Sequence, residues 1–234
     1  LVRSRGLGDV YKRQITGRSY YGRVYCFCKK KGWCNNLMGY SINTITADCY
    51  IGTTCLINKF GIKDEKKLSL VEGEITFAKG SELESNPILG NYDFQHYKAI
   101  HKYLFEDIYD WAGKIRNVDI SKKGTQFAKA KEIEELAGAC FSRLKSENYF
   151  MNQDFKPFVN NIVDFYCVTN ILHPFREGNG RTQRIFISQL IRHAGYEIEF
   201  SKISADDLMS ATIKAANGVN DYLKDIFTKV IKVN

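Results

Sequence analysis

The clearest pattern along the chain is a helical one between residues 158 and 172. Core-type positions recur there at steps of three and four, which places them on one face of an α-helix. These positions are Phe158, Ile162, Phe165, Thr169 and Leu172. We expect this helix to be the most buried element, and we expect a second apolar helix over residues 181–193, ended by Gly195.

The same periodicity predicts five more helices, at about residues 64–78, 93–108, 131–147, 204–217 and 220–231. Asp64 is a candidate N-cap, and Ser204 with Asp207 has capping-box spacing. The expected buried faces are Leu68, Val71, Ile75 and Ala78; Phe94, Tyr97, His101, Leu104 and Ile108; Ile133, Leu136, Cys140 and Leu144; Leu208, Ala211 and Ala215; and Tyr222, Leu223, Ile226 and Val230. His101 lies on an apolar face, which favours a hydrogen-bonded core histidine. The fold class is therefore mainly α.

Two segments depart from this helical pattern. Residues 79–91 form a polar stretch with glycine and proline, which predicts a loop. Residues 114–128 contain two short runs of strand type on either side of Lys122-Lys123-Gly124-Thr125, which predicts a β-hairpin. A plain surface hairpin would have the same pattern.

Charge is distributed unevenly along the chain. The 234 residues are 44% hydrophobic and 26% charged, as in one or two soluble domains, and no apolar run is long enough to span a membrane. The net charge is +8, and residues 1–37, with nine Lys or Arg and one Asp, account for all of it. The remainder is neutral overall, so nucleic acid is not an expected partner.

Residues 1–37 also look foreign to the rest of the chain. Leu1 to Gln14 resembles a translated sequencing adapter, and the first methionine is Met38. We expect residues 1–37 to be a non-native leader, made of adapter and translated upstream DNA, followed by one domain over 38–234 with its core at about 48–232. A basic tail that binds nucleic acid is the alternative.

Cysteine usage indicates a reducing compartment. Cys26, Cys28 and Cys34 lack the paired spacing of a usual zinc site, and the other four cysteines are scattered. Cys140 and Cys167 fall within apolar helical patterns, where a free thiol packs as a small hydrophobe. No secretory signal follows Met38, so we expect a cytoplasmic protein.

Residues 173–184 concentrate the chemically active side chains between two apolar helices. His173 can accept a proton near neutral pH. Glu177 can bind Mg²⁺, which prefers one or two carboxylates together with phosphate oxygens. Each of these residues alone is more often structural or solvated, but their joint occurrence favours a functional site.

The same run contains a candidate phosphate site. Gly178, Asn179 and Gly180 let a ligand approach the main chain where a helix begins, and the N-terminus of a helix favours anions. Arg181 and Arg184 are three residues apart, so they share a face of that first turn and suit a polyphosphate. Together with the base and the carboxylate, these groups indicate transfer of a phosphate-containing group to a hydroxyl.

The run resembles the Fic motif, His-x-Phe-x-(Asp/Glu)-Gly-Asn-Gly-Arg-x-x-Arg, at every fixed position. Fic proteins mostly transfer AMP from ATP to a hydroxyl side chain of a target protein. By resemblance, His173 is the base, Phe175 a core anchor and Glu177 the Mg²⁺ ligand. The predicted phosphate contacts are Gly178, Asn179, Gly180, Arg181 and Arg184. Relatives that phosphorylate instead carry lysine at the position of Gly180.

The resemblance extends over most of the chain. Residues 49–62 resemble the opening segment of a compact Fic domain, and the hairpin resembles the Fic flap. The flap would dock the target protein near Gly124–Ala128 by strand pairing. Asn217 is a candidate for contact with the nucleotide, and a helix C-cap is its alternative role.

The chain has no match to the inhibitory motif Ser/Thr-x-x-x-Glu-Gly/Asn of many Fic proteins. Glu72-Gly73 has Leu68 four residues earlier, Glu147-Asn148 has Arg143, and Glu177-Gly178 belongs to the central motif itself. The resemblance therefore implies a toxin-type member, restrained by a small antitoxin whose glutamate pairs with Arg184. We expect a cytoplasmic protein adenylyltransferase with ATP as substrate and Mg²⁺ as cofactor, and no membrane partner. The alternatives are the same fold with another nucleotide or phosphate donor, and a non-catalytic interaction module.

Overall fold

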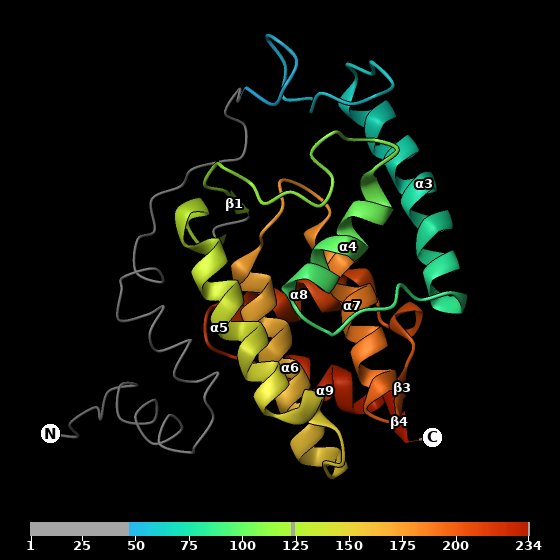
Figure 1. Cartoon of the computed structure of the whole chain (residues 1–234), viewed down its shortest axis with the longest axis vertical. Helices are drawn as coiled ribbons and strands as arrows, with labels where there is room; N and C mark the ends of the chain where they lie inside the picture. Colours follow the sequence, from blue (N-terminus) through green and yellow to red (C-terminus); the bar gives the residue numbers. More distant parts are fainter. Residues whose placement is uncertain (1–46, 123–124, 234) are drawn as a thin grey trace, which may run out of the picture. The chain divides into compact units, whose positions relative to one another are not determined.

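Seven α-helices make up most of the described residues, 47–122 and 125–233, of this computed structural model (Figure 1). The helices are α3 (Glu65–Ser85), α4 (Phe94–Phe105), α5 (Ile133–Ser146), α6 (Phe155–Leu172), α7 (Asn179–His193), α8 (Ala205–Ala216) and α9 (Asp221–Val230). The strands β1 (Ser121–Lys122) and β2 (Thr125–Gln126) form one antiparallel pair, and β3 (Tyr196–Ile198) and β4 (Ile231–Val233) form another. The fold is mainly helical with a small hairpin, as predicted.

Several expectations lie outside the described residues. The chain divides into two units, Leu1–Asn36 and Leu37–Asn234, and the described residues all belong to the second. The expected leader, its three cysteines and the proposed start at Met38 therefore stay predictions, and so does the part of Gly124 in the flap. None of the helices that the structure describes is long and apolar enough to cross a membrane.

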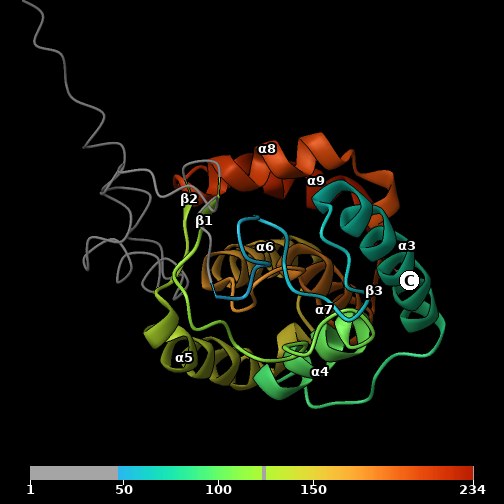
Figure 2. The same cartoon turned by 90° about the horizontal axis from the view of Figure 1, so that it is seen from above.

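Helices α6 and α7 form the centre of the described unit (Figure 2). Helix α6 packs against α5, α7, α8 and α9, while α7 also contacts α3, α4 and β3. All five predicted core positions of α6 are buried. Burial of an aliphatic or aromatic side chain contributes about 1.5–3 kcal/mol relative to its exposure, so this stripe anchors the residues that follow it.

Helix α3 continues beyond its predicted end and stops at Ser85. The predicted loop over 79–91 was therefore wrong for residues 79–85 and correct for 86–91, which have neither helix nor strand. Gly80 lies inside the helix and faces α7, where an added Cβ would be 3.6 Å from Ile185 Cδ1. A helical glycine costs only about 0.5–1 kcal/mol relative to alanine, which packing can offset. Pro87 is the effective stop, because the residue before a proline disfavours helical geometry.

The buried face of α3 also differs from the prediction. Ala78 is exposed, and Val71 and Ile75 are only partly covered. The buried positions are Leu68, Glu72, Thr76 and Leu83. Two of these are polar, which apolar periodicity cannot detect, and both contact the candidate site described below.

Pairing between distant strands was missed at the C-terminal end. Ile231 was expected in the last helix, but it pairs with Ile198 in the β3–β4 sheet. Runs of three residues are too short to give a strand signal of their own. In α9, Phe227 is fully buried while Tyr222 is half exposed, so the predicted face was partly wrong.

Helix ends and caps were predicted more accurately. Asp64 accepts a hydrogen bond from the N–H of Lys67, and Ser204 accepts one from the N–H of Asp207. Helix α4 ends at Phe105, earlier than expected. The expected face of α8 is buried at all three positions, and α5 buries all but one of its four.

His101 is a core histidine, as expected. The N–H of Gly113 donates to its Nδ1 over 2.8 Å, so Nε2 carries the proton and donates to the carbonyl of Glu177 over 3.0 Å. Its ring stacks on Phe175 with 3.8 Å between ring centroids. Burial is the main cause that lowers the pKa of His101, to about 4. The neutral ring therefore supports the loop that carries Glu177.

Replacing His101 with Phe should keep the stacking and remove both hydrogen bonds. We expect the free energy of unfolding to fall by about 2–3 kcal/mol, because two partly buried main-chain groups lose their partners. Urea denaturation at pH 7.5 measures this loss. If the free energy of unfolding falls no more than for an ordinary surface substitution, the two hydrogen bonds of His101 do not stabilise the fold.

The same substitution has a pH signature. The unfolded chain protonates His101 near pH 6.5 but the folded chain only near pH 4, so His101 makes the wild type less stable as pH falls through this window. Stability of the Phe variant should therefore decline less steeply between these pH values. Equal slopes would show that His101 is not held neutral.

Candidate active site

The loop between α6 and α7 begins at His173, which caps α6 in a left-handed conformation with φ 39° and ψ 61°. A non-glycine residue held in this region costs about 1–3 kcal/mol and needs support from its surroundings. Gly178 ends the loop with φ 78°, and an added Cβ there would lie 2.1 Å from Phe105 Cζ. Glycine is therefore required at this position for both backbone geometry and space.

Asn179 holds the loop together through its side chain. Its Oδ1 accepts from the N–H of Phe175 and its Nδ2 donates to the Phe175 carbonyl, both over 2.8 Å. Asn179 is 5% exposed, and Phe175 is fully buried as expected. Because the amide is already paired, the main chain of Asn179 is the group left for contact with a phosphate. That N–H lies in the first turn of α7, where helical N–H groups have no intrahelical partner.

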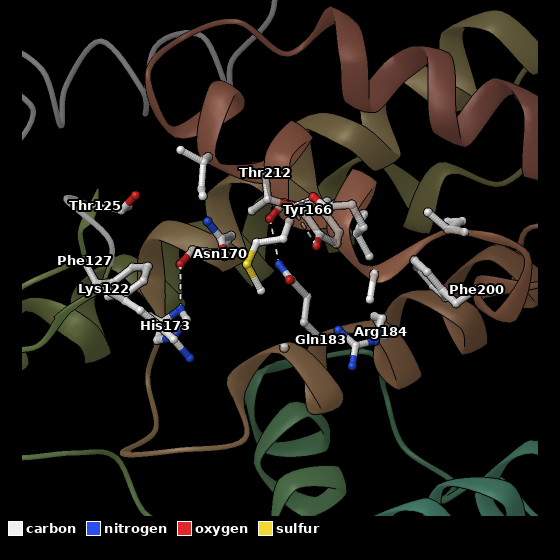
Figure 3. A pocket seen from close by; sticks show the side chains of 16 residues that line it. Lys122, Thr125, Phe127, Tyr166, Asn170, His173, Gln183, Arg184, Phe200 and Thr212 are labelled. Atoms are coloured by element: carbon white, nitrogen blue, oxygen red, sulfur yellow. Dashed lines mark hydrogen bonds between the residues drawn. The ribbon is translucent and has the colours of Figure 1, made fainter. Parts of the chain in front are cut away.

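A cavity of about 460 Å³ opens beside this loop (Figure 3). Among the predicted site residues it is lined by His173, Gly180 and Arg184. Helix α8 and the preceding turn contribute mostly apolar side chains, namely Phe200, Ile203, Ala205, Leu208, Met209, Thr212 and Ile213. A cavity with a cationic group and an apolar wall suits a nucleotide, whose phosphates and base need these two surroundings.

His173 has the geometry of a base. Its Nδ1 lies 3.1 Å from the carbonyl of Asn170, which fixes the proton on Nδ1 and leaves the lone pair on Nε2. Phe127 of the hairpin stacks on the ring, with 3.6 Å between centroids and 11° between planes. Burial is the main cause that lowers the pKa of His173, to about 4. The ring is therefore neutral at pH 7 and can accept a proton at Nε2.

Arg184 faces the cavity without a partner. Within the described ranges, 47–122 and 125–233, its guanidinium has no hydrogen bond and no ion pair. Burial is the main cause that lowers its pKa, yet an arginine stays protonated in proteins. A partly buried charge without a counter-ion is costly, and this cost would be relieved by an anion in the cavity.

Arg181 points instead toward α3. Its Nη2 donates to Glu72, its Nη1 donates to Thr76 Oγ1 over 3.0 Å, and a longer contact of 3.4 Å joins it to Glu177. Tyr109 donates to the other oxygen of Glu72 over 2.5 Å. Arg181 is not among the residues that line the cavity, so the structure gives the two motif arginines different surroundings.

Glu177 lies at the edge of this arrangement with its side chain 41% exposed. Its Oε1 accepts from the N–H of Gly178 over 2.9 Å, and no described residue donates to its Oε2. Burial alone would raise the pKa of Glu177, but this hydrogen bond and the charges of Lys122 and Arg181 hold it below its ordinary value. The carboxylate is therefore ionised and has one oxygen open to a cation.

This donor set fits Mg²⁺ only in the presence of a phosphate ligand. No cluster of three or more His, Cys, Asp or Glu side chains occurs in the part of the chain that the structure describes. Mg²⁺ commonly uses one or two carboxylates and completes its shell with phosphate oxygens and water. Glu177 can supply that single carboxylate.

Asn217 lies apart from the cavity. It is the C-cap of α8, it is exposed, and its Nδ2 donates to the carbonyl of Ile213 over 2.9 Å. It is absent from the residues that line the cavity. Its placement matches the capping role that the sequence left open, and Thr212 and Ile213 of the same helix line the cavity in its place.

Glu72 and Thr76 were missed as part of the site. Their i, i+4 spacing on a helix was a possible signal, since two polar residues on one helical face can both reach the same partner. The partner, Arg181, could not be assigned, because it is 109 residues away from Glu72 in the chain.

Replacing Glu72 with Ala should destabilise the fold by about 1–3 kcal/mol, because the buried Tyr109 hydroxyl and the partly buried Arg181 each lose a hydrogen-bond partner. The matched control is Glu199→Ala, which removes exposed pairs with Lys202 and Lys232 and should have little effect on stability. Urea denaturation of both variants measures the difference. Similar losses would show that Glu72 acts as an ordinary surface charge.

Comparison with known proteins identifies the family. Residues 91–191 match the model of the Fic/DOC family. The chain is 38% identical over 177 residues to the protein adenylyltransferase VbhT of Bartonella schoenbuchensis, covering 76% of this chain but only 37% of that protein. It is 35% identical over 182 residues to the "Probable protein adenylyltransferase Fic" of Salmonella typhimurium, covering 78% of this chain and 90% of that one.

A solved structure has the same fold. The BepC protein of Bartonella tribocorum, crystallised with bound AMPPNP, superposes with a TM-score of 0.74 and 27% sequence identity. The match covers 80% of this chain and 97% of that one. With the full motif, the helical fold and these relatives in agreement, the chain belongs to the Fic/DOC family.

Proposed function

We propose that this chain is a protein adenylyltransferase that moves AMP from ATP to a hydroxyl side chain of a target protein. The observation that carries the proposal is one cavity, beside the start of α7, that is lined by a neutral His173 and by Arg184, which has no ion-pair partner among the described residues. The relatives named as protein adenylyltransferases, and the neighbour with bound AMPPNP, support ATP as the donor.

The reaction follows from the positions of these groups. The target hydroxyl attacks the α-phosphate of ATP, a new oxygen–phosphorus bond forms, and the bond to pyrophosphate breaks. His173 Nε2 accepts the hydroxyl proton, while Nδ1 stays hydrogen-bonded to the carbonyl of Asn170. Arg184 and the free N–H groups at the start of α7 stabilise the charge that develops on the leaving pyrophosphate. In this arrangement, the apolar side chains of α8 contact the adenine base of ATP.

Glu177 is the residue that would hold Mg²⁺ in this proposal, through its open Oε2. Bound Mg²⁺ would neutralise charge on the phosphates. Arg181 contributes indirectly, because it contacts Glu177 and is itself held by Glu72 and Thr76. We therefore assign Arg181 mainly to the support of the loop and Arg184 to the phosphates.

The proposal includes two protein partners. A target would pair with the edge of the β1–β2 hairpin, whose residues Thr125, Phe127 and Lys122 line the cavity. A small antitoxin would supply a glutamate to Arg184. In support, Arg184 has no carboxylate partner among the described residues, and residues 1–46 contain no glutamate. This arrangement fits the toxin of a toxin–antitoxin pair.

A reducing, cytoplasmic setting belongs to the same proposal. Cys55, Cys140 and Cys167 form no disulfide among the described residues. Burial is the main cause that raises the pKa of Cys167, to about 12, and the pKa of Cys140 is raised for the same reason. Such thiols are unreactive packing groups and need no oxidising environment.

Replacing His173 with Ala should lower AMP transfer by at least about 100-fold, because the general base is lost. The assay uses host-cell lysate, Mg²⁺ and ATP labelled at the α-phosphate, with the labelled protein band as the readout. Binding of a non-hydrolysable ATP analogue should be largely unchanged, since Arg184 and the α7 N-terminus remain. If another nucleotide labels the target and ATP does not, the chain is a transferase that uses a different donor. If no donor gives a labelled band, a non-catalytic binding module is favoured.

The rate of transfer should be nearly constant between pH 7.5 and pH 5.5. A histidine with the ordinary pKa of about 6.5 would be about 90% protonated at pH 5.5, and the rate would fall about tenfold. His173, with its pKa lowered to about 4, stays neutral over this range and remains able to accept a proton. The rate at saturating ATP, with circular dichroism as a control for folding, tests this directly. A tenfold loss would show that the base titrates normally.

A further inference from the structure

Arg116 is a buried charge without a carboxylate partner in the described ranges. It is 5% exposed, and its guanidinium donates to three main-chain carbonyls. Nε donates to His173 over 2.8 Å, Nη1 donates to Val118 over 2.6 Å, and Nη2 donates to Ala128. Burial is the main cause that lowers its pKa, to about 10, so it remains charged at neutral pH.

These carbonyls belong to two parts of the site. Val118 and Ala128 lie on either side of the β1–β2 hairpin, one before it and one after it. His173 carries the imidazole that faces the cavity. One guanidinium therefore joins both ends of the hairpin to the main chain of the candidate base.

Main-chain hydrogen bonds strengthen the same connection. The N–H of Arg116 donates to the carbonyl of Pro174, and the N–H of Ala128 donates to the carbonyl of Ile171, both over 2.9 Å. The hairpin is thus attached to the end of α6 just before His173 and to the residue just after it. Because His173 has a left-handed backbone, its position depends on such external contacts.

The hairpin also contacts the imidazole ring itself. Phe127, which directly precedes Ala128, stacks on His173 with 3.6 Å between the ring centroids. A shift of the hairpin relative to α6 would therefore displace Phe127 from the imidazole ring and weaken the hydrogen bonds that hold the backbone around His173. Arg116 is placed to prevent that shift, since it bonds to both sides at once.

Arginine suits this task better than other residues. Its planar fork presents several donors at fixed angles, while lysine has one point charge on a flexible stem. Moving a charge into the interior is costly, and neutral carbonyls compensate less well than a carboxylate would. An apolar side chain could fill the same space without this cost. The presence of a charged side chain here therefore indicates a role in positioning.

We propose that Arg116 is a positioning residue that fixes the hairpin to His173, so that the edge offered to a target protein and the base lie at a set distance from each other. This inference rests on the proposed AMP transfer for its kinetic consequence. Its structural part, the dependence of His173 on Arg116, can be measured without any activity.

The experiment compares Arg116→Met and Arg116→Lys with the matched control Arg192→Met. Arg192 lies on α7 and pairs with Glu84 and Glu197, away from the cavity residues. For each protein we would measure the thermal unfolding midpoint, the Kd for a non-hydrolysable ATP analogue, and the rate of AMP transfer to the labelled lysate target. The imidazole signals of the chain's four histidines would be recorded by NMR, with His173→Ala used to assign the His173 signal.

We expect Arg116→Met to lower the transfer rate by about 100-fold, the scale expected for a reacting group displaced by about 1 Å. The Kd for the ATP analogue should stay near the wild-type value, because Arg184 and α8 are unaltered. The His173 signal should shift, since the ring loses its fixed position against Phe127. Arg192→Met should change neither the rate nor the His173 signal.

Other outcomes separate the two proposals. Unchanged transfer and an unchanged His173 signal in Arg116→Met would overturn the positioning role. If Arg116→Met does not fold, Arg116→Lys decides, since it keeps the charge but cannot reach all three carbonyls; wild-type transfer by a folded Arg116→Lys would overturn the role equally. If the wild type transfers no label, the proposed function fails, and the shift of the His173 signal still tests the coupling.

Discussion

The loop between α6 and α7 depends on side chains to satisfy its main-chain polar groups. Buried N–H and C=O groups must be paired, and this loop has neither a helix nor a sheet to pair them. The partners come from three different parts of the chain: α4, the segment before the hairpin and α7. Arg116 binds the carbonyl of His173, Asn179 binds both main-chain groups of Phe175, and His101 binds the carbonyl of Glu177. The shape of the loop is therefore set by groups that take no part in the chemistry.

The loop is held by contacts on two sides. Towards α4 and α3, the loop is held by His101 and by the contact between Arg181 and Glu72. Towards the hairpin, it is held by Arg116 and by the stack of Phe127 on His173. A base that must meet an incoming hydroxyl within hydrogen-bond distance benefits from such support, because small displacements are costly in rate.

The sequence predicted those features that depend on neighbouring residues. The buried stripe of α6, the caps at Asp64 and Ser204 and the glycine turn at Gly178 all follow from local rules, and the structure confirms them. Family membership followed from a motif of twelve consecutive residues, which is also local. Local rules are strong here because helices dominate the fold and their periodicity is regular.

What the sequence did not predict depends on pairs far apart in the chain. The face of α3 was misassigned because two of its buried residues are polar, and their side chains bind the distant residues Arg181 and Tyr109. The β3–β4 sheet was missed because each strand has only three residues, and because α8 and α9 separate the two strands in the chain. The role of Arg116 was not predicted, because its three partners are main-chain carbonyls, which every residue type has.

The two motif arginines show how tertiary structure divides residues that sequence treats alike. Arg181 is paired with Glu72 and does not line the cavity, so Glu72 offsets part of its attraction for phosphates. Arg184 keeps its full charge there, beside the start of α7. In the proposed reaction, a single carboxylate placed against Arg184 would cancel most of the fixed attraction for the leaving pyrophosphate. An enzyme with its charges divided in this way can be restrained by one glutamate from a partner, without any change in the loop that holds the base.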